Sequence, residues 1–451
     1  MRTPRRRSLL GGLARDLACG IAVALALPGA AAGQGRPAAG ARPGPPCAAD
    51  DGGLALADGF CARLVARNLG AVRQLAVAPD GTLYAALSRG SAFTGKQELT
   101  SSIGGVLAFR DANGDGDFDE RAAFGPGPGN AVAVVDGHLY FALRDRIVRW
   151  RLTPGRLEPV GDPETIVRDL PADGDHYAKA IAFGPGSTLY VSVASASNSC
   201  QKVNRLSASP GRDPCPELAR RAGIWRFDRN RPGQTEADGT RFATGIRNGS
   251  AIAVRPGTDE LWVAMNGRDQ LSQSWGFSDQ VNAENPGEEL LLVRPGQDYG
   301  WPYCYWSVQY GRKVLAPEYG GDGKSVGRCA RAADPVMVFP AHWAPLALAF
   351  GPGPASGLDT GGQGGLFVAM HGSWNRAPLP QAGYRVVYVP FANGRPTGRF
   401  VTFAASADGA TGLRAAGVAV APDGSVYISD DNAGKIWRVW RRGNQGPGTR
   451  D

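Results

Sequence analysis

The sequence predicts an all-β protein built as a six-bladed β-propeller. An apolar strand, a short turn with Gly, Pro or Asp, and a second strand recur six times, at 75–87, 131–143, 181–193, 252–264, 348–370 and 418–430. One such hairpin cannot cover its own apolar face, so regular repetition favours blades packed around an axis. The 451 residues are 43% hydrophobic, enough for a large core, and no long helical periodicity competes with this interpretation.

The spacing of the repeats predicts where the long loops lie. Successive copies start 56, 50, 71, 96 and 70 residues apart. One four-stranded blade needs about 40 to 50 residues, so the surplus in the later copies predicts long loops on one rim. The rim and the central channel are where such folds place their functional sites.

The first 33 residues differ from the rest of the chain. Three consecutive arginines, Arg5 to Arg7, precede an apolar run that ends near Ala26 and is followed by a run of alanines. This order predicts an export signal peptide that resembles twin-arginine signals, although Asp16 leaves the ordinary secretory route open. A membrane anchor is the alternative, but the apolar run is short for a bilayer span. We therefore expect a periplasmic or secreted protein with no stable membrane span.

The charge balance and the composition of the two ends set the remaining boundaries. The formal net charge is +8, and without residues 1–32 it falls to +4, from 44 Lys and Arg against 40 Asp and Glu. Such mild basicity gives no argument for nucleic-acid binding. We expect a flexible lead-in rich in Ala, Gly and Pro at 34–50, the propeller at 51–443 and a tail at 444–451.

The cysteines suggest disulfides. Of seven cysteines, Cys19 lies in the export signal, and an even number in an exported chain favours pairing. A zinc site is the weaker interpretation, because the chain has no CxxC and four histidines. Six cysteines allow about 15 connectivities. Their clustering along the sequence favours Cys47 with Cys61, Cys200 with Cys215, and Cys304 with Cys329.

His176 is the candidate general base. It stands in DGDHYAKAIAF, directly before the third repeat, with Asp175 beside it. Histidine titrates nearest neutral pH, and an adjacent carboxylate can orient the ring and raise its basicity. The alternative is a surface-loop histidine with acidic neighbours.

Further polar residues precede or follow other repeats. Arg247 and Asn248 precede the fourth repeat, Trp374 and Arg376 follow the fifth in HGSWNRAP, and Arg414 precedes the sixth. Because the innermost strand of each blade faces the channel, these side chains are expected to converge toward the axis. The three arginines predict a positive funnel suited to a polyanionic small ligand such as a carboxylated quinone. The alternative for each is a surface turn or a rim salt bridge.

Two segments are candidate calcium sites. The loop after the fourth repeat is dense in Asn, Asp, Glu and Gly, whose oxygens suit Ca²⁺. DANGDGDFDE at 111–120 supplies Asp111, Asn113 and Asp115, but Ala122 at the twelfth position excludes an EF-hand. We expect a structural calcium site at the tip of a hairpin.

An ordered set of phrases carries a family resemblance. DHYAKAIAFGP, GIRN, NGRD, DYGWPYCY, AHWAPLALAF, HGSWNR and VAVAPDGSVYISDD together resemble the quinoprotein soluble sugar dehydrogenases, in their sorbosone or aldose dehydrogenase branch. The resemblance runs from about residue 60 to residue 440. It implies a six-bladed propeller that binds pyrroloquinoline quinone and Ca²⁺ and oxidises the C1 hydroxyl of an aldose or a hydrated sugar aldehyde.

The resemblance also implies roles for individual residues. His176 takes the hydroxyl proton with help from Asp175, while Arg247 stabilises charge on the reduced quinone. Asn248 and Trp374 belong to the cofactor site, and Arg376 and Arg414 pair with the quinone carboxylates. The backbone carbonyls of Gly267 and Arg268 hold the calcium ion.

Two other functions compete with this one. A calcium-dependent propeller lactonase uses metal-bound carboxylates at the axis, and a non-catalytic propeller binds a partner across its rim. The three arginines favour the dehydrogenase over both. The sequence contains no CxxCH haem motif, so a separate protein or quinone is expected to accept the electrons from the reduced enzyme.

Overall fold

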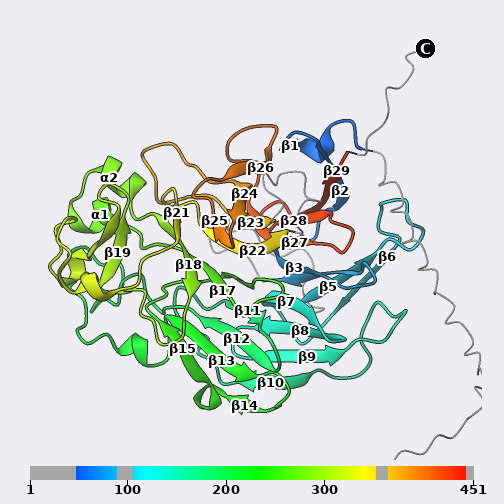
Figure 1. Cartoon of the computed structure of the whole chain (residues 1–451), viewed down its shortest axis with the longest axis horizontal. Coiled ribbons are helices and arrows are strands. Elements are labelled where there is room, and N and C mark those ends of the chain that lie inside the picture. The colour runs from blue at the N-terminus through cyan, green and yellow to red at the C-terminus, as the bar shows by residue number, and fades with distance from the viewer. Residues whose placement is uncertain (1–46, 89–104, 352–363, 443–451) are drawn as a thin grey trace, which may run out of the picture. The chain divides into compact units, whose positions relative to one another are not determined.

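The structure is a computed structural model that describes residues 47–88, 105–351 and 364–442. Its strands form a six-bladed propeller, which confirms the predicted fold class (Figure 1). The export signal at 1–33, most of the lead-in at 34–50 and the tail at 444–451 lie outside the described residues. In the part of the chain that is described, no helix is long and apolar enough to span a bilayer.

The first three blades follow one another along the chain, each starting with its innermost strand. Blade one contains β3 (Val72–Val77), β4 (Leu83–Leu87), β5 (Val106–Arg110) and β6 (Glu120–Phe124). Blade two contains β7 (Gly129–Val135), β8 (His138–Leu143), β9 (Ile147–Arg151) and β10 (Glu164–Arg168), extended by the parallel β14 (Gln234–Thr235). Blade three contains β11 (Lys179–Phe183), β12 (Thr188–Val193), β13 (Gly223–Asp228) and β15 (Thr240–Thr244).

The last three blades include the two strands that close the ring. Blade four contains β16 (Ala251–Val254), β17 (Leu261–Met265), β18 (Glu288–Val293) and β21 (Met337–Phe339). Blade five contains β22 (Pro345–Gly351), β23 (Gly365–Met370), β24 (Arg385–Ala392) and β26 (Val401–Ser406), with β1 (Leu54–Leu56) at its edge and the short β25 (Arg395–Pro396) paired with β24. Blade six contains β27 (Ala415–Val420), β28 (Val426–Asp430), β29 (Lys435–Arg441) and β2 (Phe60–Ala66).

The ring is closed by strands from opposite ends of the chain. The early strand β2 pairs antiparallel with β29, so blade six contains strands from both ends of the propeller sequence. The innermost strands contact each other in the order β3, β7, β11, β16, β22, β27 and back to β3. All six therefore present their ends to one axial channel.

The repeated turns form for a local chemical reason. In the Pro-Asp-Gly turns of blades one and six, the side chain of Asp80 or Asp423 accepts a hydrogen bond from the amide two residues later, at 3.0 and 2.9 Å. The following glycines, Gly81 and Gly424, have φ angles of 86° and 83°, which favour glycine. These turns set the register of the inner hairpins.

The hydrophobic core lies between neighbouring blades. Trp262 of β17 is fully buried, and its ring meets Phe391 of β24 edge-on at a centroid distance of 5.2 Å. The same cluster contains Leu290 of blade four with Leu366 and Val387 of blade five. Because each blade buries its apolar faces against the next, single repeats gain stability only within the closed ring.

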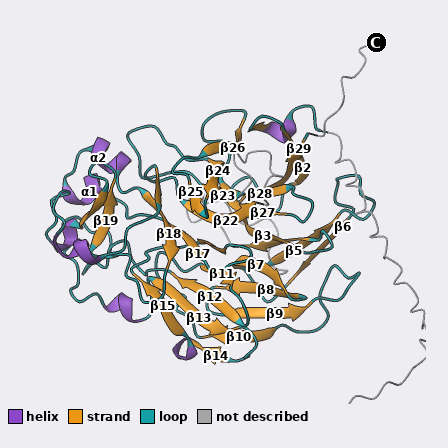
Figure 2. Ribbon diagram, in the orientation of Figure 1, coloured by secondary structure: helices purple, strands orange, loops and turns teal. Residues whose placement is uncertain are grey.

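The three favoured disulfides, Cys47–Cys61, Cys200–Cys215 and Cys304–Cys329, are all present. The last two lie in the long loops of blades three and four, and their four sulfurs share one buried cluster with Trp301 and Tyr303. These loops hold the hairpin β19 (Cys304–Ser307) and β20 (Arg312–Leu315), with α1 (Leu271–Trp275) and α2 (Asp279–Glu284). The helices gather beside β19 on one side of the propeller (Figure 2).

Short 3-10 turns complete the secondary structure. They are η1 (Asp51–Gly53), η2 (Pro216–Ala219), η3 (Glu236–Asp238), η4 (Pro317–Tyr319) and η5 (Gly327–Arg331). The described elements thus begin at residue 51 and end at residue 441.

Candidate active site at the mouth of the axial channel

A cavity of about 630 Å³ opens at the axis. This volume lies within the range of small-molecule sites, about 300 to 1,000 Å³. Every blade contributes to the wall from its innermost strand or the segment just before it. One such residue from each, in blade order, is Arg73, Asn130, His176, Asn248, Leu346 and Arg414.

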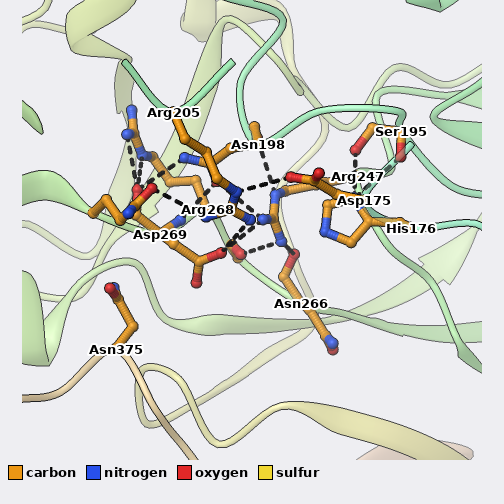
Figure 3. Close-up of polar contacts among 12 residues, drawn as sticks. Asp175, His176, Ser195, Asn198, Arg205, Arg247, Asn266, Arg268, Asp269 and Asn375 are labelled. Atoms are coloured by element: carbon orange, nitrogen blue, oxygen red, sulfur yellow. Dashed lines mark hydrogen bonds and ion pairs between the residues drawn. The ribbon is translucent and has the colours of Figure 1, made fainter. Parts of the chain in front are cut away.

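His176 is half-buried and lines this cavity. Its Nδ1 lies 3.1 Å from the carbonyl oxygen and 3.0 Å from the Oγ of Ser195 (Figure 3). A carbonyl only accepts, and the Ser195 hydroxyl already donates to the carbonyl of Ser197 at 2.7 Å. Nδ1 therefore carries the proton, and the lone pair of Nε2 is left for a ligand. This is the arrangement that a general base requires.

Burial, and then the positive charge of Arg247, lower the pKa of His176 to about 3. The unfolded pKa is about 6.5, so the folded protein binds fewer protons between these values. The contribution of His176 to stability is thus highest above pH 6.5 and decreases as the pH falls toward 3.

We expect the His176 ring in the cofactor-free protein to remain neutral between pH 8 and about pH 4. Imidazole chemical shifts followed through a pH titration of histidine-labelled protein would test this. His138, which is outside the cavity lining, is the internal comparison. A His176 midpoint near that of a free histidine would contradict the expectation.

Asp175 lines the cavity, but among the described residues its side chain hydrogen-bonds to Arg205 and Asn204 and not to His176. Its Oδ2 accepts from Nε of Arg205 at 2.8 Å and from Nδ2 of Asn204 at 3.1 Å. Within the described residues, Ser195 is thus the hydrogen-bond partner of the His176 ring, and Asp175 acts on it through charge alone. Sequence proximity had suggested Asp175 for the orienting role.

Arg247 is buried, and all its N–H groups have acceptors within the protein. Nε donates to the carbonyl of Asn198 at 3.0 Å, and Nη2 donates to Oδ1 of Asn198 at 2.9 Å and to Asp269 at 3.0 Å. Nη1 donates to the carbonyls of Gly267 at 2.6 Å and Asn266 at 3.4 Å. The guanidinium is therefore a fixed positive charge beside His176, as Figure 3 shows.

Asn198 and Asp269 organise this part of the site, and sequence reasoning missed both. Asn198 is 1% exposed, and its side chain also accepts from the amide of Asp269 at 2.9 Å. Burial would raise the pKa of Asp269, but Arg247 and Arg205 outweigh it and lower the pKa. Asn198 stands two residues before Cys200, so the sequence signal available was a polar residue next to a disulfide-closed loop.

Glu288 of β18 is a buried carboxyl group at the cavity wall. Its Oε2 accepts from the amide of Gly267 at 2.8 Å, and its Oε1 accepts from the amide of Ala344 at 3.1 Å. Burial raises the pKa of Glu288 to about 7. Glu288 thereby links the segment after β17 of blade four to the segment before β22 of blade five.

Two further histidines line the cavity. Nε2 of His342 lies 2.7 and 3.0 Å from the carbonyls of Asn282 and Asn285, and burial lowers the pKa of His342. His371 lies between Arg414 and Asp431, with Nδ1 at 3.0 Å from Nη2 of Arg414 and Nε2 at 2.7 Å from Oδ1 of Asp431.

The arginines at the cavity differ in how their charge is compensated. Arg73, Arg205 and Arg247 each form an ion pair with a carboxylate. For Arg414, the described residues include no carboxylate within ion-pair distance of its guanidinium, whose partners are His371 and, at 5.4 Å, the ring of Tyr384. Arg414 is thus the cavity arginine best placed to attract an anionic ligand.

The remaining predicted cofactor residues occupy different places. Asn248 lines the cavity and accepts a hydrogen bond from Ser250 at 2.9 Å, and Trp374 lines its mouth, 42% exposed. Arg376 is not among the lining residues. Its guanidinium donates to the backbone carbonyls of Pro380, at 2.9 Å, and Ala283. The structure therefore groups Arg247 and Arg414 at the cavity and places Arg376 outside its lining.

The predicted calcium ligands also separate into two places. The Gly267 carbonyl lies at the cavity and accepts from Arg247; the side chain of Arg268, whose backbone carbonyl is the other predicted ligand there, forms a buried ion pair with Glu318. Asp111, Asn113 and Asp115 lie at the β5–β6 hairpin tip, where their side chains cap backbone amides of the same loop. Across the described ranges, no group of three His, Cys, Asp or Glu side chains is placed to hold a metal ion.

Two amide oxygens at the cavity suggest that the site accepts a polar ligand. Oδ1 of Asn266 and Oδ1 of Asn375 are buried and, among the described residues, have no hydrogen-bond partner. Leaving a polar atom buried and unpaired costs about 1–3 kcal/mol. An amide oxygen accepts hydrogen bonds, so each of these two atoms favours a ligand group that donates one. The cavity therefore offers acceptors at Asn266 and Asn375 for the O–H or N–H groups of a ligand, and a donor at Arg414 for an anionic group.

Comparison with known proteins agrees with this fold. A family model described as TrAA12-like matches residues 54–442. Among curated proteins, the chain is 27% identical over 241 residues to the pyrroloquinoline quinone-dependent pyranose dehydrogenase of Coprinopsis cinerea, covering 45% of this chain and 31% of that protein. It is 23% identical over 182 residues to the aldose sugar dehydrogenase YliI of Escherichia coli, covering 37% and 40%. The chain thus spans less than half the length of these curated relatives.

Solved structures show the same fold. A structure of a Trichoderma reesei carbohydrate-active enzyme of family AA12 aligns with a TM-score of 0.69 at 21% identity, covering 86% of this chain and 98% of that one. The holo form of the pyranose dehydrogenase PQQ domain from Coprinopsis cinerea aligns with a TM-score of 0.67 at 20% identity, covering 86% and 97%.

Proposed function

We propose a function from one premise: this chain belongs to the TrAA12-like family, whose model matches residues 54–442. The function is oxidation of the C1 hydroxyl of an aldose, or of a hydrated sugar aldehyde such as sorbosone, with pyrroloquinoline quinone as cofactor and Ca²⁺ beside it. The names of the Coprinopsis cinerea and Escherichia coli relatives support this class of reaction.

One observation carries the proposal. His176 offers the lone pair of Nε2 to the same cavity into which Arg414 brings a guanidinium without a carboxylate partner among the described residues. A base and an uncompensated cation in one cavity match a neutral alcohol substrate and an anionic cofactor.

His176 and Arg247 have separate roles in the proposed reaction. Bound pyrroloquinoline quinone supplies the acceptor for the two electrons of the oxidation. Nε2 of His176 takes the proton of the substrate hydroxyl, and the fixed charge of Arg247 favours negative charge that develops beside it. Because Arg247 is already held by Asn198 and Asp269, its charge needs no rearrangement during the reaction.

Other residues of the cavity bind and orient. Arg414 pairs with a cofactor carboxylate, Asn248 holds cofactor or substrate, and Trp374 offers an aromatic face at the mouth. The carbonyls of Gly267 and Arg268 are the proposed calcium ligands, and backbone oxygens are ligands that Ca²⁺ accepts readily. Since the Gly267 carbonyl accepts from Arg247, calcium there would share this oxygen with the guanidinium.

The setting of the reaction is outside the cytoplasm. Three disulfides in the described residues favour an oxidising compartment, which agrees with the export signal expected at 1–33. A separate cytochrome or quinone then reoxidises the enzyme.

Titration with pyrroloquinoline quinone and Ca²⁺ tests the proposal. We expect stoichiometric binding, followed by loss of the oxidised quinone absorbance when an aldose or aldehyde from a panel is added. Arg414→Ala should weaken quinone binding about 10- to 100-fold, because it removes a charge-assisted contact. Arg376→Ala is the matched control, because that residue is outside the cavity lining and its guanidinium donates to backbone carbonyls.

The outcome separates the proposal from its alternatives. Absence of quinone binding at micromolar concentration would contradict the dehydrogenase function. The lactonase and the non-catalytic binding module would then remain as the alternative functions. The lactonase is less favoured, because it would not need the arginines that line this cavity.

A further inference from the structure

Four side chains form a continuous chain of contacts along one side of the cavity. They come from blade one (Arg73 of β3), from the segment after β28 of blade six (Asp431), from the segment after β23 of blade five (His371), and from the residue before β27 (Arg414). Arg73 pairs with Asp431, Asp431 contacts Nε2 of His371 at 2.7 Å, and Nδ1 of His371 contacts Arg414 at 3.0 Å.

The chemistry of the two ends determines the tautomer of the histidine. An arginine only donates, so Nδ1 of His371 accepts from Arg414 and has no proton. Nε2 then carries the ring proton and donates it to the carboxylate of Asp431. Nε of Arg414 also lies 3.4 Å from Nε2, which places the guanidinium beside the ring; in this tautomer Nε2 carries the proton and donates to Asp431, so it does not accept from Nε.

Asp431 is ionised in this arrangement. It is 6% exposed, and burial alone would raise its pKa, but His371 and Arg73 outweigh burial and lower the pKa. Arg73 also donates from Nε to Oδ1 of Asn130 at 3.1 Å, which fixes it against blade two. Arg73 thus compensates the negative charge of Asp431, and the positive charge of Arg414 stays uncompensated.

A neutral imidazole holds Arg414 differently from a carboxylate. A carboxylate would fix the guanidinium and also compensate its charge, whereas an imidazole lone pair fixes the guanidinium and leaves the charge in place. The four groups together carry one net positive charge, and it is located on Arg414 at the cavity.

We propose that His371 is a positioning residue that orients Arg414 toward a carboxylate of the bound quinone, and that Asp431, fastened by Arg73, determines the tautomer of His371. This inference rests on the proposed function for the identity of the ligand. The tautomer itself can be measured without any ligand, so the two can fail separately.

The first experiment measures the tautomer in the cofactor-free protein. The chain has four histidines, so long-range proton–nitrogen correlations of ¹⁵N-histidine protein can be assigned through single substitutions. We expect His371 to be protonated at Nε2. In Asp431→Asn the amide oxygen turns to Arg73 and the amide nitrogen faces the ring, so the proton should move to Nδ1. Wild-type His371 with the proton on Nδ1 would overturn the proposal.

The second experiment measures the dissociation constant of pyrroloquinoline quinone. Asp431→Asn should weaken binding about tenfold or more, because Nδ1–H then opposes the guanidinium. In an Arg414→Ala background the same change should have no further effect. A loss from general damage to the fold would instead add to that of Arg414→Ala.

A matched pair of variants keeps the test independent of whether Asp431→Asn folds. His371→Asn places an acceptor oxygen where Nδ1 lies and should bind the quinone nearly as wild type does. His371→Gln places it near Nε2 and should bind about tenfold more weakly. Equal affinities for the two variants would contradict the positioning role. His138→Asn, remote from the cavity lining, is the control for histidine substitution.

If wild-type protein does not bind the quinone, the proposed function fails and the quinone role of His371 fails with it. The tautomer measurement would then still decide whether Asp431 governs how His371 holds Arg414.

Discussion

Replacing His176 with alanine lowers the turnover number of the quinone-loaded enzyme by about 10²–10⁴-fold, the usual contribution of a positioned general base. The reason is that Nδ1 of His176 is occupied by Ser195, which leaves Nε2 as the nitrogen that faces the ligand. Quinone affinity should stay close to that of wild type, because Arg414 and Asn248 are unchanged. Steady-state kinetics on the best aldose, with a parallel quinone titration, measures both quantities.

Two controls make this result specific. His138→Ala removes a histidine whose ring contacts the carbonyl of Asp136 at 2.9 Å outside the cavity lining, and it should leave turnover unchanged. His342→Ala removes the other cavity histidine near Asp269, whose Nδ1 lies 4.0 Å from Oδ1 of that residue. If His342→Ala abolished turnover and His176→Ala did not, the base would have to be reassigned to His342.

Replacing Arg268 with methionine lowers the free energy of unfolding by about 3–5 kcal/mol, because it leaves the carboxylate of Glu318 buried without its cation. The side chains of this pair are 3% and 0% exposed. The remaining partner of Glu318 is the indole N–H of Trp275 at 3.0 Å, and one neutral donor does not compensate a buried charge. Urea unfolding of the cofactor-free, disulfide-intact protein gives the measurement.

The double variant separates a lost contact from an unpaired charge. Arg268→Met with Glu318→Gln removes both charges, so most of the lost stability should return. Arg231→Met is the matched control, because its pair with Asp238 is 55% and 38% exposed and is worth about 0–1 kcal/mol. A double variant as unstable as Arg268→Met would mean that packing, rather than charge, explains the loss.

The propeller could be predicted from sequence because its signals are local. Strand alternation and the Pro-Asp-Gly turns involve residues within one hairpin, and the regular spacing of the copies shows that the same hairpin is repeated. The three disulfides followed from the same kind of proximity, since each pair is separated by 25 residues or fewer.

The site could be predicted only in part, because two of its features depend on distant segments. His176 was recognisable beside Asp175, but its hydrogen-bond partner is Ser195, 19 residues further on. Arg376 and Arg414 look alike as sequence, yet Arg376 donates to the carbonyl of Ala283, 93 residues away, and Arg414 remains at the cavity. Nothing local distinguishes the two arginines.

By itself, the sequence determined the blades and favoured the disulfide pairs and the candidate base, because short-range patterning and turn chemistry carry these signals. The tertiary structure alone decided which charges are compensated. Arg247 is fixed by Asn198 and Asp269, which lie 49 and 22 residues away, and Arg414 is held by His371, 43 residues away. A buried guanidinium donates to the acceptors that the folded ring places around it. Closing the ring requires strands from both ends of the propeller sequence.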